Sequence, residues 1–240
     1  TMETEATPVG DAFELNGVKS FVLDGHTAQQ ILVFARDPGT SGSDGLSLFL
    51  TSSDAAGLQR QLLKSMDSTR KLARLEFKGV KAILLGEQGA AAMPFAKTLD
   101  LAVACLANEM VGGAEALREQ ALDYAQMRMQ FGRAIASFQT MKHKQADMLI
   151  DVELAKSAAY CAAAAVEEKP DELPAVASLA KAGASEAYLR TAIHTIQIHG
   201  GIGFTWDNDT HLWFKRAKSS QVFLGDANFH RERMLRCWQD

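Results

Sequence analysis

The residues whose types and spacing most clearly suggest a binding or catalytic role lie in the segment 128–133 (RMQFGR). Phe138 and Gln139 follow closely. Arg128 comes at the end of a long helical pattern, where a cation stabilises the negative end of the helix dipole. An arginine beside a glycine that permits close approach could also hold a phosphate or carboxylate through a forked contact. Spacing alone leaves a second interpretation open and favours it, namely a C-terminal helix cap followed by a hydrophobic turn.

A second candidate is the segment 197–204 (QIHGGIGF). Gly200 and Gly201 close a predicted helix, and two adjacent glycines let a ligand or another backbone approach without meeting a Cβ atom. The segment is not a dinucleotide fingerprint, because no strand precedes it and the GxGxxG spacing is absent. His199 is expected to be a hydrogen-bonded structural histidine rather than a metal ligand.

The third candidate combines the segments 223–226 (FLGD) and 230–233 (HRER). Taken alone it predicts a last helix capped by Asp226, with a charged surface turn. The chain carries no nucleophile elbow, P-loop or catalytic cysteine motif. Its histidines show no ligand spacing with cysteine or carboxylate, so we expect no metal.

Composition limits the classes of protein that these segments could serve. The 240 residues are 47% hydrophobic and 22% charged, which is typical of a folded globular chain and excludes disordered, collagen-like and coiled-coil proteins. A net charge of −4 gives no basic excess for nucleic acid. The three cysteines are dispersed, no apolar run is long enough for a membrane span, and the start lacks a signal-peptide pattern. These features predict a cytoplasmic protein.

The chain changes character near Pro94, which predicts an α+β protein with a β domain over 1–94 and a helical domain over 95–240. Before that point short apolar runs alternate with turn residues, and an Asn16-Gly17 pair predicts a hairpin. Further breaks are expected at Asp24-Gly25, at 37–39 and at Lys78-Gly79. The expected antiparallel strands are 18–23, 31–35, 46–50, 72–77 and 81–85.

After Pro94 the sequence is rich in alanine and follows the helical period. A stripe on the first helix is expected at Leu99, Val103, Leu106, Met110, Gly113 and Leu117. Long helices with short connections predict an up-down antiparallel bundle. The expected helices are 98–127, 140–166, 174–199, 210–223 and 226–238.

Together these segments resemble the acyl-CoA dehydrogenase flavoprotein family, in order and over nearly the whole chain. The resemblance implies an antiparallel β-barrel or sandwich-like domain followed by the helical bundle. It also implies that an N-terminal helical domain of the family is missing here, and we expect that this chain is a fragment. The matching pieces are 17–22, Arg128-x-x-Phe131-Gly132, Phe138-Gln139, His143, 146–148, Gln197-x-x-Gly200-Gly201-x-Gly203-Phe204 and Phe223-x-Gly225.

The resemblance implies that FAD lies between the β domain of one subunit and the bundle of its neighbour. Arg128 would neutralise the FAD pyrophosphate from across the interface, and Phe131 and Gln139 would line the adenosine half. Phe138 belongs to the same cofactor-binding motif. Backbone near Phe21 and Leu23 would face the isoalloxazine, although the family usually has Trp and Thr at these two positions. Gln197, Gly200 and Gly201 would contact the dinucleotide.

The family reaction removes the α-proton of an acyl-CoA thioester with a carboxylate while a hydride leaves the β-carbon for the flavin, giving a 2,3-enoyl-CoA. Leu224 stands at the usual position of the catalytic glutamate, and Ala102, followed by Val103 where arginine is common, stands at the alternative position. We therefore assign no catalytic residue. Glu109, two turns beyond Ala102, is either a displaced base or, as spacing favours, a glutamate paired with arginine or lysine.

Three functions stay open on this basis. The chain could belong to an acyl-CoA dehydrogenase whose base is placed unusually, or it could be a base-lacking FAD-binding subunit of a heteromer. It could also be a non-catalytic structural module. For the active site of this chain alone, the absence of glutamate at both positions favours the second function over the first. For the whole assembly the label of acyl-CoA dehydrogenase is preferred, with acyl-CoA as substrate and a homo- or hetero-oligomer, dimer or tetramer, that shares FAD sites.

Overall fold

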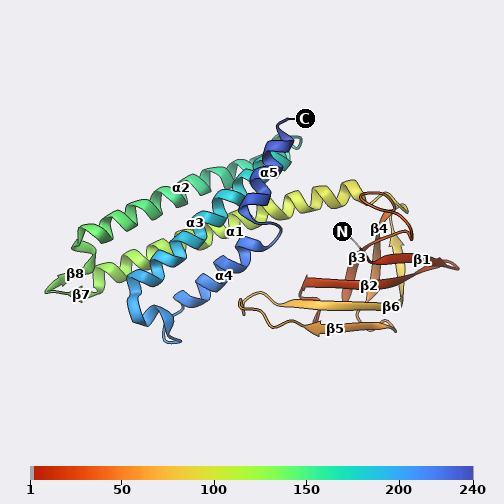
Figure 1. Cartoon of the computed structure of the whole chain (residues 1–240), viewed down its shortest axis with the longest axis horizontal. Helices are drawn as coiled ribbons and strands as arrows, with labels where there is room; N and C mark the ends of the chain where they lie inside the picture. Colours follow the sequence, from red (N-terminus) through yellow and green to blue (C-terminus); the bar gives the residue numbers. More distant parts are fainter. Residues whose placement is uncertain (1–2, 240) are drawn as a thin grey trace. The chain divides into compact units, whose positions relative to one another are not determined.

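The computed structural model describes residues 3–239 and divides into two compact units, Thr1–Lys97 and Thr98–Asp240. The first unit is built from strands and the second from helices (Figure 1). The α+β class and the order of its two parts are therefore confirmed. No helix within the described residues combines the length and apolarity needed to span a membrane.

The β unit is a closed barrel. Its sheet has the order β2-β1-β3-β4-β6-β5, and β2 also pairs with β6, which joins the two ends of the ring and leaves β5 on the outside of β6. Inward residues such as Leu15, Phe49 and Leu75 are at most 1% exposed. The strands are β1 (Glu5–Val9), β2 (Ala12–Leu23), β3 (Gln30–Arg36), β4 (Leu46–Ser52), β5 (Leu58–Leu62) and β6 (Leu72–Leu85).

Two expected turns in this unit are wrong. Asn16-Gly17 lies inside β2 and Lys78-Gly79 inside β6, and the two strands pair with a register shift between Leu15 and Gly17. The Asn16 Oδ1 atom accepts a hydrogen bond of 2.8 Å from the Gly79 N–H, so the turn-forming residues stabilise a bulge rather than a hairpin. The hairpin loop lies earlier, between β1 and β2, where Val9 pairs with Ala12.

The sheet also departs from a purely antiparallel meander. β1 pairs in parallel with β3 at Glu5 and Arg36, while the remaining strand pairs of the described chain are antiparallel. The strands β1 and β5 were not expected from the sequence. β5 (LQRQL) is short and mostly exposed, with leucine only at its two ends, so its sequence shows no regular apolar alternation.

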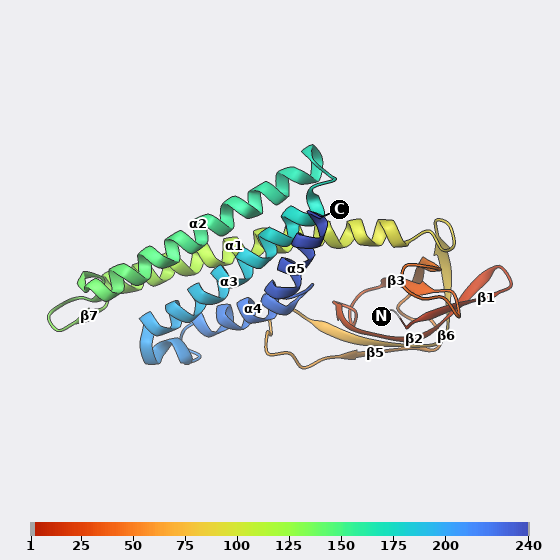
Figure 2. The same ribbon diagram turned by 45° about the horizontal axis from the view of Figure 1, so that its top comes forward.

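The helical unit contains three long antiparallel helices and two shorter ones (Figures 1 and 2). The first helix starts at Ala92 rather than at residue 98, because Pro94 falls in its first turn, where a missing N–H costs nothing. The other four helices begin and end within two residues of the expected positions. The helices are α1 (Ala92–Met127), α2 (Gln139–Glu168), α3 (Leu173–His199), α4 (Thr210–Val222) and α5 (Ala227–Cys237).

Small residues set the packing of this bundle. A Cβ atom on Gly113 of α1 would lie 2.6 Å from the Tyr188 ring of α3, so only glycine permits this contact. Val103, Met110 and Leu117 of the expected stripe are buried. Leu99 is an exception, since it is 37% exposed before the bundle core begins.

Two buried polar side chains hold the connection between α4 and α5. Lys181 of α3 is fully buried, and its Nζ donates to the carbonyls of Gln221 at 3.2 Å and Gly225 at 3.0 Å. The His230 ring lies 3.0 Å, through Nε2, from the Leu224 carbonyl. Asp226 caps α5 by accepting from the Phe229 N–H, as expected. The segment 230–233, however, lies within α5 and is not a surface turn.

The bulge at Gly17 yields a test of the barrel. Gly17 has φ +139°, and an added Cβ would lie 2.7 Å from the Thr4 Cα, so Gly17→Ala should lower the free energy of unfolding by about 1–3 kcal/mol. The matched control is Gly10→Ala, because Gly10 also has a positive φ but no atom within 4 Å of an added Cβ. Urea unfolding of both variants measures the difference. Equal losses would contradict the close approach of Thr4 to Gly17.

Burial of His230 yields a test of the helical unit. Burial is the largest of the influences on this ring and lowers its pKa to about 4, whereas an exposed histidine has a pKa near 6.5. The unfolded chain therefore takes up the proton first, and the stabilisation present above pH ~6.5 is lost as pH falls toward ~4. We expect His230→Gln to have a shallower decline in the free energy of unfolding between pH 7 and 4 than the parent chain. Ser157→Ala, which changes an exposed side chain of α2 that carries no titrating group, should leave the slope unchanged.

Candidate functional site

Three chain segments meet at one end of the helical unit. The Tyr124 ring near the end of α1 stacks on the His199 ring at the end of α3, with centroids 4.2 Å apart. A small apolar cluster, including Ile135, Met148 and Ile198, joins these ends to the start of α2. Figures 1 and 2 both show the end of α1, the start of α2 and the end of α3 at the same end of the bundle. Residues far apart in the sequence are thus brought together.

A strained hairpin projects from this end. It consists of β7 (Met129–Gln130) and β8 (Arg133–Ala134), with Phe131 at φ 53° and Gly132 at φ 73° in its turn. A two-residue turn with both φ angles positive suits a hairpin, but a bulky residue adopts it only at a cost of about 1–2 kcal/mol. The Phe131 ring is nevertheless 91% exposed. Strain combined with exposure of a large ring indicates a binding role rather than a role in the core.

The helix-cap interpretation of this segment is therefore wrong in its detail. α1 ends at Met127, and the Arg128 N–H still donates to the Tyr124 carbonyl at 2.9 Å. The Phe131-Gly132 pair does not cap that helix but turns the hairpin beyond it. The side chain of Arg128 is exposed at the base of the hairpin, where it can meet an anion.

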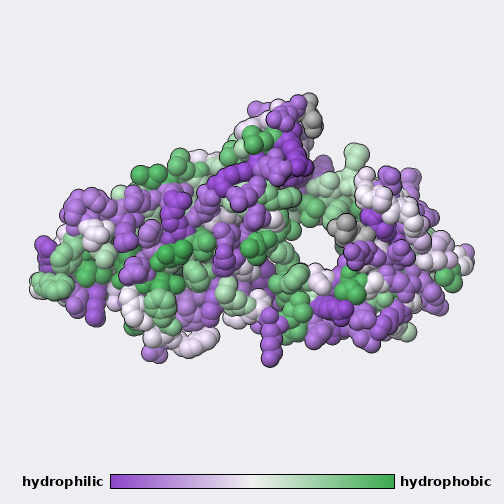
Figure 3. Space-filling view, in the orientation of Figure 1, coloured by the Kyte–Doolittle hydropathy of each residue, from purple (hydrophilic) through white to green (hydrophobic). Residues whose placement is uncertain are grey.

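Aromatic rings and cations gather around the hairpin. The Phe131 and Phe138 rings lie edge to face with centroids 6.1 Å apart, and the Arg133 guanidinium lies 4.1 Å from the centre of the Phe138 ring. Gln139 is exposed at the start of α2, with its Nε2 2.9 Å from His143 Nε2. In the space-filling view hydrophobic and hydrophilic side chains lie side by side at the left tip of the bundle (Figure 3). Arg133 was not expected as a site residue, because its contact with Phe138 depends on the turn.

The end of α3 forms the second part of this site. Gly200 ends the helix at φ 65°, and a Cβ atom on Gly200 or Gly201 would meet no atom within 4 Å, so the space outside these residues is open. Gln197 is exposed on the last turn. His199 is 8% exposed and its Nδ1 lies 2.8 Å from the Thr195 carbonyl, so its predicted structural role is confirmed. Open backbone and an exposed amide can approach a polar ligand closely.

Two of the expected cofactor residues belong to the β unit instead. Phe21 has φ 60° and is 65% exposed, and Leu23 is 48% exposed. The pairing of β2 with β6 shifts register between Lys19 and Val22, which turns the Phe21 backbone outward from the regular ladder. The structure thus places both residues on an exposed stretch of β2, with a strained backbone at Phe21.

The positions at which a catalytic base would stand hold no carboxylate. Leu224 lies between α4 and α5 with φ 60°, held through its carbonyl by His230, and its side chain packs against the bundle core. Ala102 lies on α1. Glu109 accepts hydrogen bonds from Arg216 Nε at 3.0 Å and Nη2 at 2.8 Å, so the interpretation of Glu109 as a paired glutamate is confirmed. Residues 3–239 hold no group of three or more side chains that could ligate a metal.

The sequence matches two family descriptions. Residues 1–80 match the middle domain of acyl-CoA dehydrogenases, and residues 87–237 match their C-terminal domain. Among named relatives, "Acyl-CoA dehydrogenase IpdE2" of Mycobacterium tuberculosis is 38% identical over 68% of this chain and 47% of its own length. An acyl-CoA dehydrogenase of Bacillus subtilis is 30% identical over 96% of this chain and 62% of its own. The chain thus spans about half to three fifths of these relatives.

Solved structures give the same result. Butyryl-CoA dehydrogenase from Megasphaera elsdenii superposes with a TM-score of 0.93 and 28% identity, covering 100% of this chain and 64% of that one. A structure described as a FAD-dependent dehydrogenase reaches a TM-score of 0.92 at 27% identity, covering 98% and 65% of the two chains. The strand barrel, the helical bundle and both sequence matches agree, and the chain belongs to the acyl-CoA dehydrogenase family.

Proposed function

We propose that this chain binds FAD at the hairpin end of its helical unit and serves the α,β-dehydrogenation of an acyl-CoA thioester. Members of the family are FAD-dependent, and the observation that carries the proposal is the exposed Phe131 on its strained hairpin, next to Arg128. Backbone strain and exposure of an aromatic ring both cost free energy, and contact between the ring and a bound ligand would offset this cost. A planar base and a diphosphate match a ring beside a guanidinium.

The residues at this end fit a dinucleotide. Arg128 would neutralise the pyrophosphate, while Phe131, Phe138 and Gln139 would line the adenosine half. The open space outside Gly200 and Gly201 lets backbone groups approach the ligand, and Gln197 offers its amide beside them. Arg133, stacked on Phe138, keeps that ring in place. Backbone near Phe21 and Leu23 would face the isoalloxazine.

When FAD is bound, it supplies the acceptor for the hydride that leaves the acyl β-carbon. The chain's own residues hold and orient the cofactor, but Leu224 and Ala102 cannot accept the α-proton. Glu109 is engaged by Arg216 and is not available at either position. We therefore place the base at none of these three positions.

The proposal includes an oligomer that shares FAD sites between subunits. Within the chain, the β domain gives way to the helical domain near residue 94. The proposed location is cytoplasmic. It is preferred over a base-lacking subunit or a structural module, because the named relatives are themselves dehydrogenases. A purely structural module also has no use for a strained, exposed aromatic turn.

Arg128 gives the direct test of cofactor binding. Losing one charge-assisted contact costs about 1.5–3 kcal/mol, so Arg128→Ala should weaken FAD binding roughly 10–100-fold. Flavin absorbance retained after gel filtration, together with titration of FAD into the stripped protein, measures this. Arg236→Ala is the matched control, since Arg236 is exposed on α5 and pairs with Glu232 of the same helix. Equal binding by both variants would contradict the assignment.

Leu224 gives the test of the missing base. Leu224→Glu places a carboxylate where the family resemblance expects one, and a positioned base contributes about 10²–10⁴-fold. We expect butyryl-CoA to bleach the flavin of this variant at least ~100-fold faster than that of the parent chain, as followed by stopped-flow absorbance. Leu224→Gln matches the shape without the base and should stay slow. Bleaching of the parent chain at the rate of Leu224→Glu would contradict the view that the missing carboxylate at position 224 limits proton removal in this chain.

A further inference from the structure

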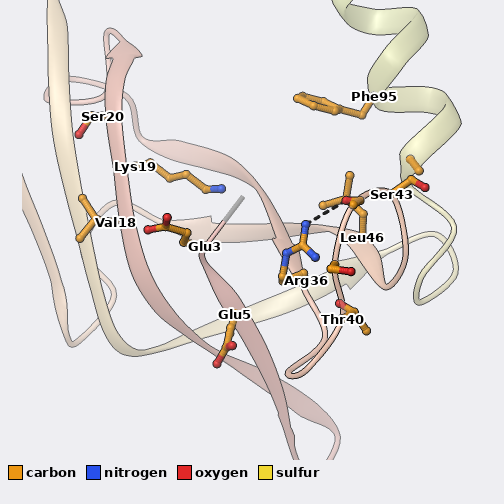
Figure 4. Close-up of a pocket in the computed structure, with 13 residues that line it drawn as sticks. Glu3, Glu5, Val18, Lys19, Ser20, Arg36, Thr40, Ser43, Leu46 and Phe95 are labelled. Atoms are coloured by element: carbon orange, nitrogen blue, oxygen red, sulfur yellow. Dashed lines mark hydrogen bonds between the residues drawn. The ribbon is translucent and has the colours of Figure 1, made fainter. Parts of the chain in front are cut away.

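The β unit contains a pocket of about 920 Å³ whose lining includes neither Phe21 nor Leu23. Its walls come from the start of the chain, from β2, from the loop after β3 and from the start of α1 (Figure 4). Apolar and polar groups share these walls. Leu46 and Phe95 provide apolar surface, and the Phe95 ring packs on Phe34 with centroids 4.4 Å apart.

One amine extends into this pocket. The side chain of Lys19 leaves β2 and reaches into the space between Glu3 and Phe95 (Figure 4). Arg36 lies across the same pocket, is only 8% exposed and donates through Nη2 to the Gly42 carbonyl at 3.0 Å. Glu3 and Glu5 bring the carboxylates that face the pocket. Lys19 is thus a half-buried amine next to a fixed positive charge.

Burial, and then the charge of Arg36, lower the pKa of Lys19 to about 8. At pH 7.5 roughly a quarter of such an amine is neutral, against about one part in a thousand for an ordinary lysine. The neutral amine is the nucleophilic form, and lowering the pKa of a lysine is one way in which proteins activate it. The pocket therefore combines a reactive amine, an apolar wall and a nearby guanidinium.

We propose that Lys19 is an acylation site that accepts acyl groups from small acyl thioesters entering this pocket. The neutral amine attacks the thioester carbonyl, the C–S bond breaks, the thiolate leaves and the amine proton passes to it through solvent, so that an amide and a thiol are formed. Leu46 and Phe95 receive the acyl chain, and the positive charge of Arg36 stabilises the developing oxyanion. The choice of a thioester as donor rests on the proposed function, but the reactivity of the amine does not.

The test is the rate of acylation at single lysines. The full chain is incubated with the butyryl thioester of N-acetylcysteamine, and peptide mass spectrometry follows Lys19 and Lys97, an exposed lysine of α1. Since a less basic amine is also a weaker nucleophile, the expected advantage of Lys19 at pH 7.5 is roughly tenfold. The rate at Lys19 should level off above about pH 8.

Two controls keep the test decisive. In urea the advantage of Lys19 should disappear, because it comes from the folded pocket. The Arg128→Ala chain should be acylated at Lys19 at the parent rate, so that failure of flavin binding and failure of this proposal are seen separately. Equal rates at Lys19 and Lys97 in the folded chain, or a Lys19 rate that still rises at pH 10, would overturn the proposal.

Discussion

The exposed phenylalanine at the hairpin turn is the constraint on which the proposed site depends. Phe131 keeps a positive φ and a ring open to solvent, and both features cost free energy in the isolated chain. The neighbouring contacts fix the hairpin rather than relieve it: Ile135 N–H donates to the Arg128 carbonyl at 2.8 Å, and the Tyr124–His199 stack ties the end of α1 to α3. The bundle thus supports a rigid projection suited to a planar, charged ligand.

Side-chain contacts also fix the backbone of the connection between α4 and α5. Lys181 and His230 are buried polar groups whose main role is to fix backbone carbonyls, and between them they set the conformation of Leu224 and Gly225. A loop held this firmly is a suitable place for a catalytic side chain, yet it presents leucine. The loop at this position is therefore firmly held, whereas the glutamate that the family resemblance expects there is replaced by Leu224.

Much of this structure could be predicted from the sequence. Helix positions followed from alanine-rich periodicity and from stops such as Gly200, because local pattern decides long helices. The strands of the barrel were harder to predict than the helices. Asn16-Gly17 is typical of a turn, but pairing with β6 makes it a bulge within β2. β5 is short and mostly exposed, with three polar residues between its terminal leucines, so its sequence does not alternate as a strand should. At the site, the sequence identified Arg128 and Phe131, whereas the Arg133–Phe138 contact depends on a turn that spacing does not specify.

The central claim is that the hairpin and the end of α3 together hold FAD. Hydrogen–deuterium exchange of the full chain, with and without FAD, tests it most directly. The account predicts that FAD slows amide exchange in the segments 128–135 and 197–203 and leaves the outer helical surface of α2 unchanged. Protection confined to other parts of the chain, with both of these segments exchanging as fast as in the free protein, would contradict it.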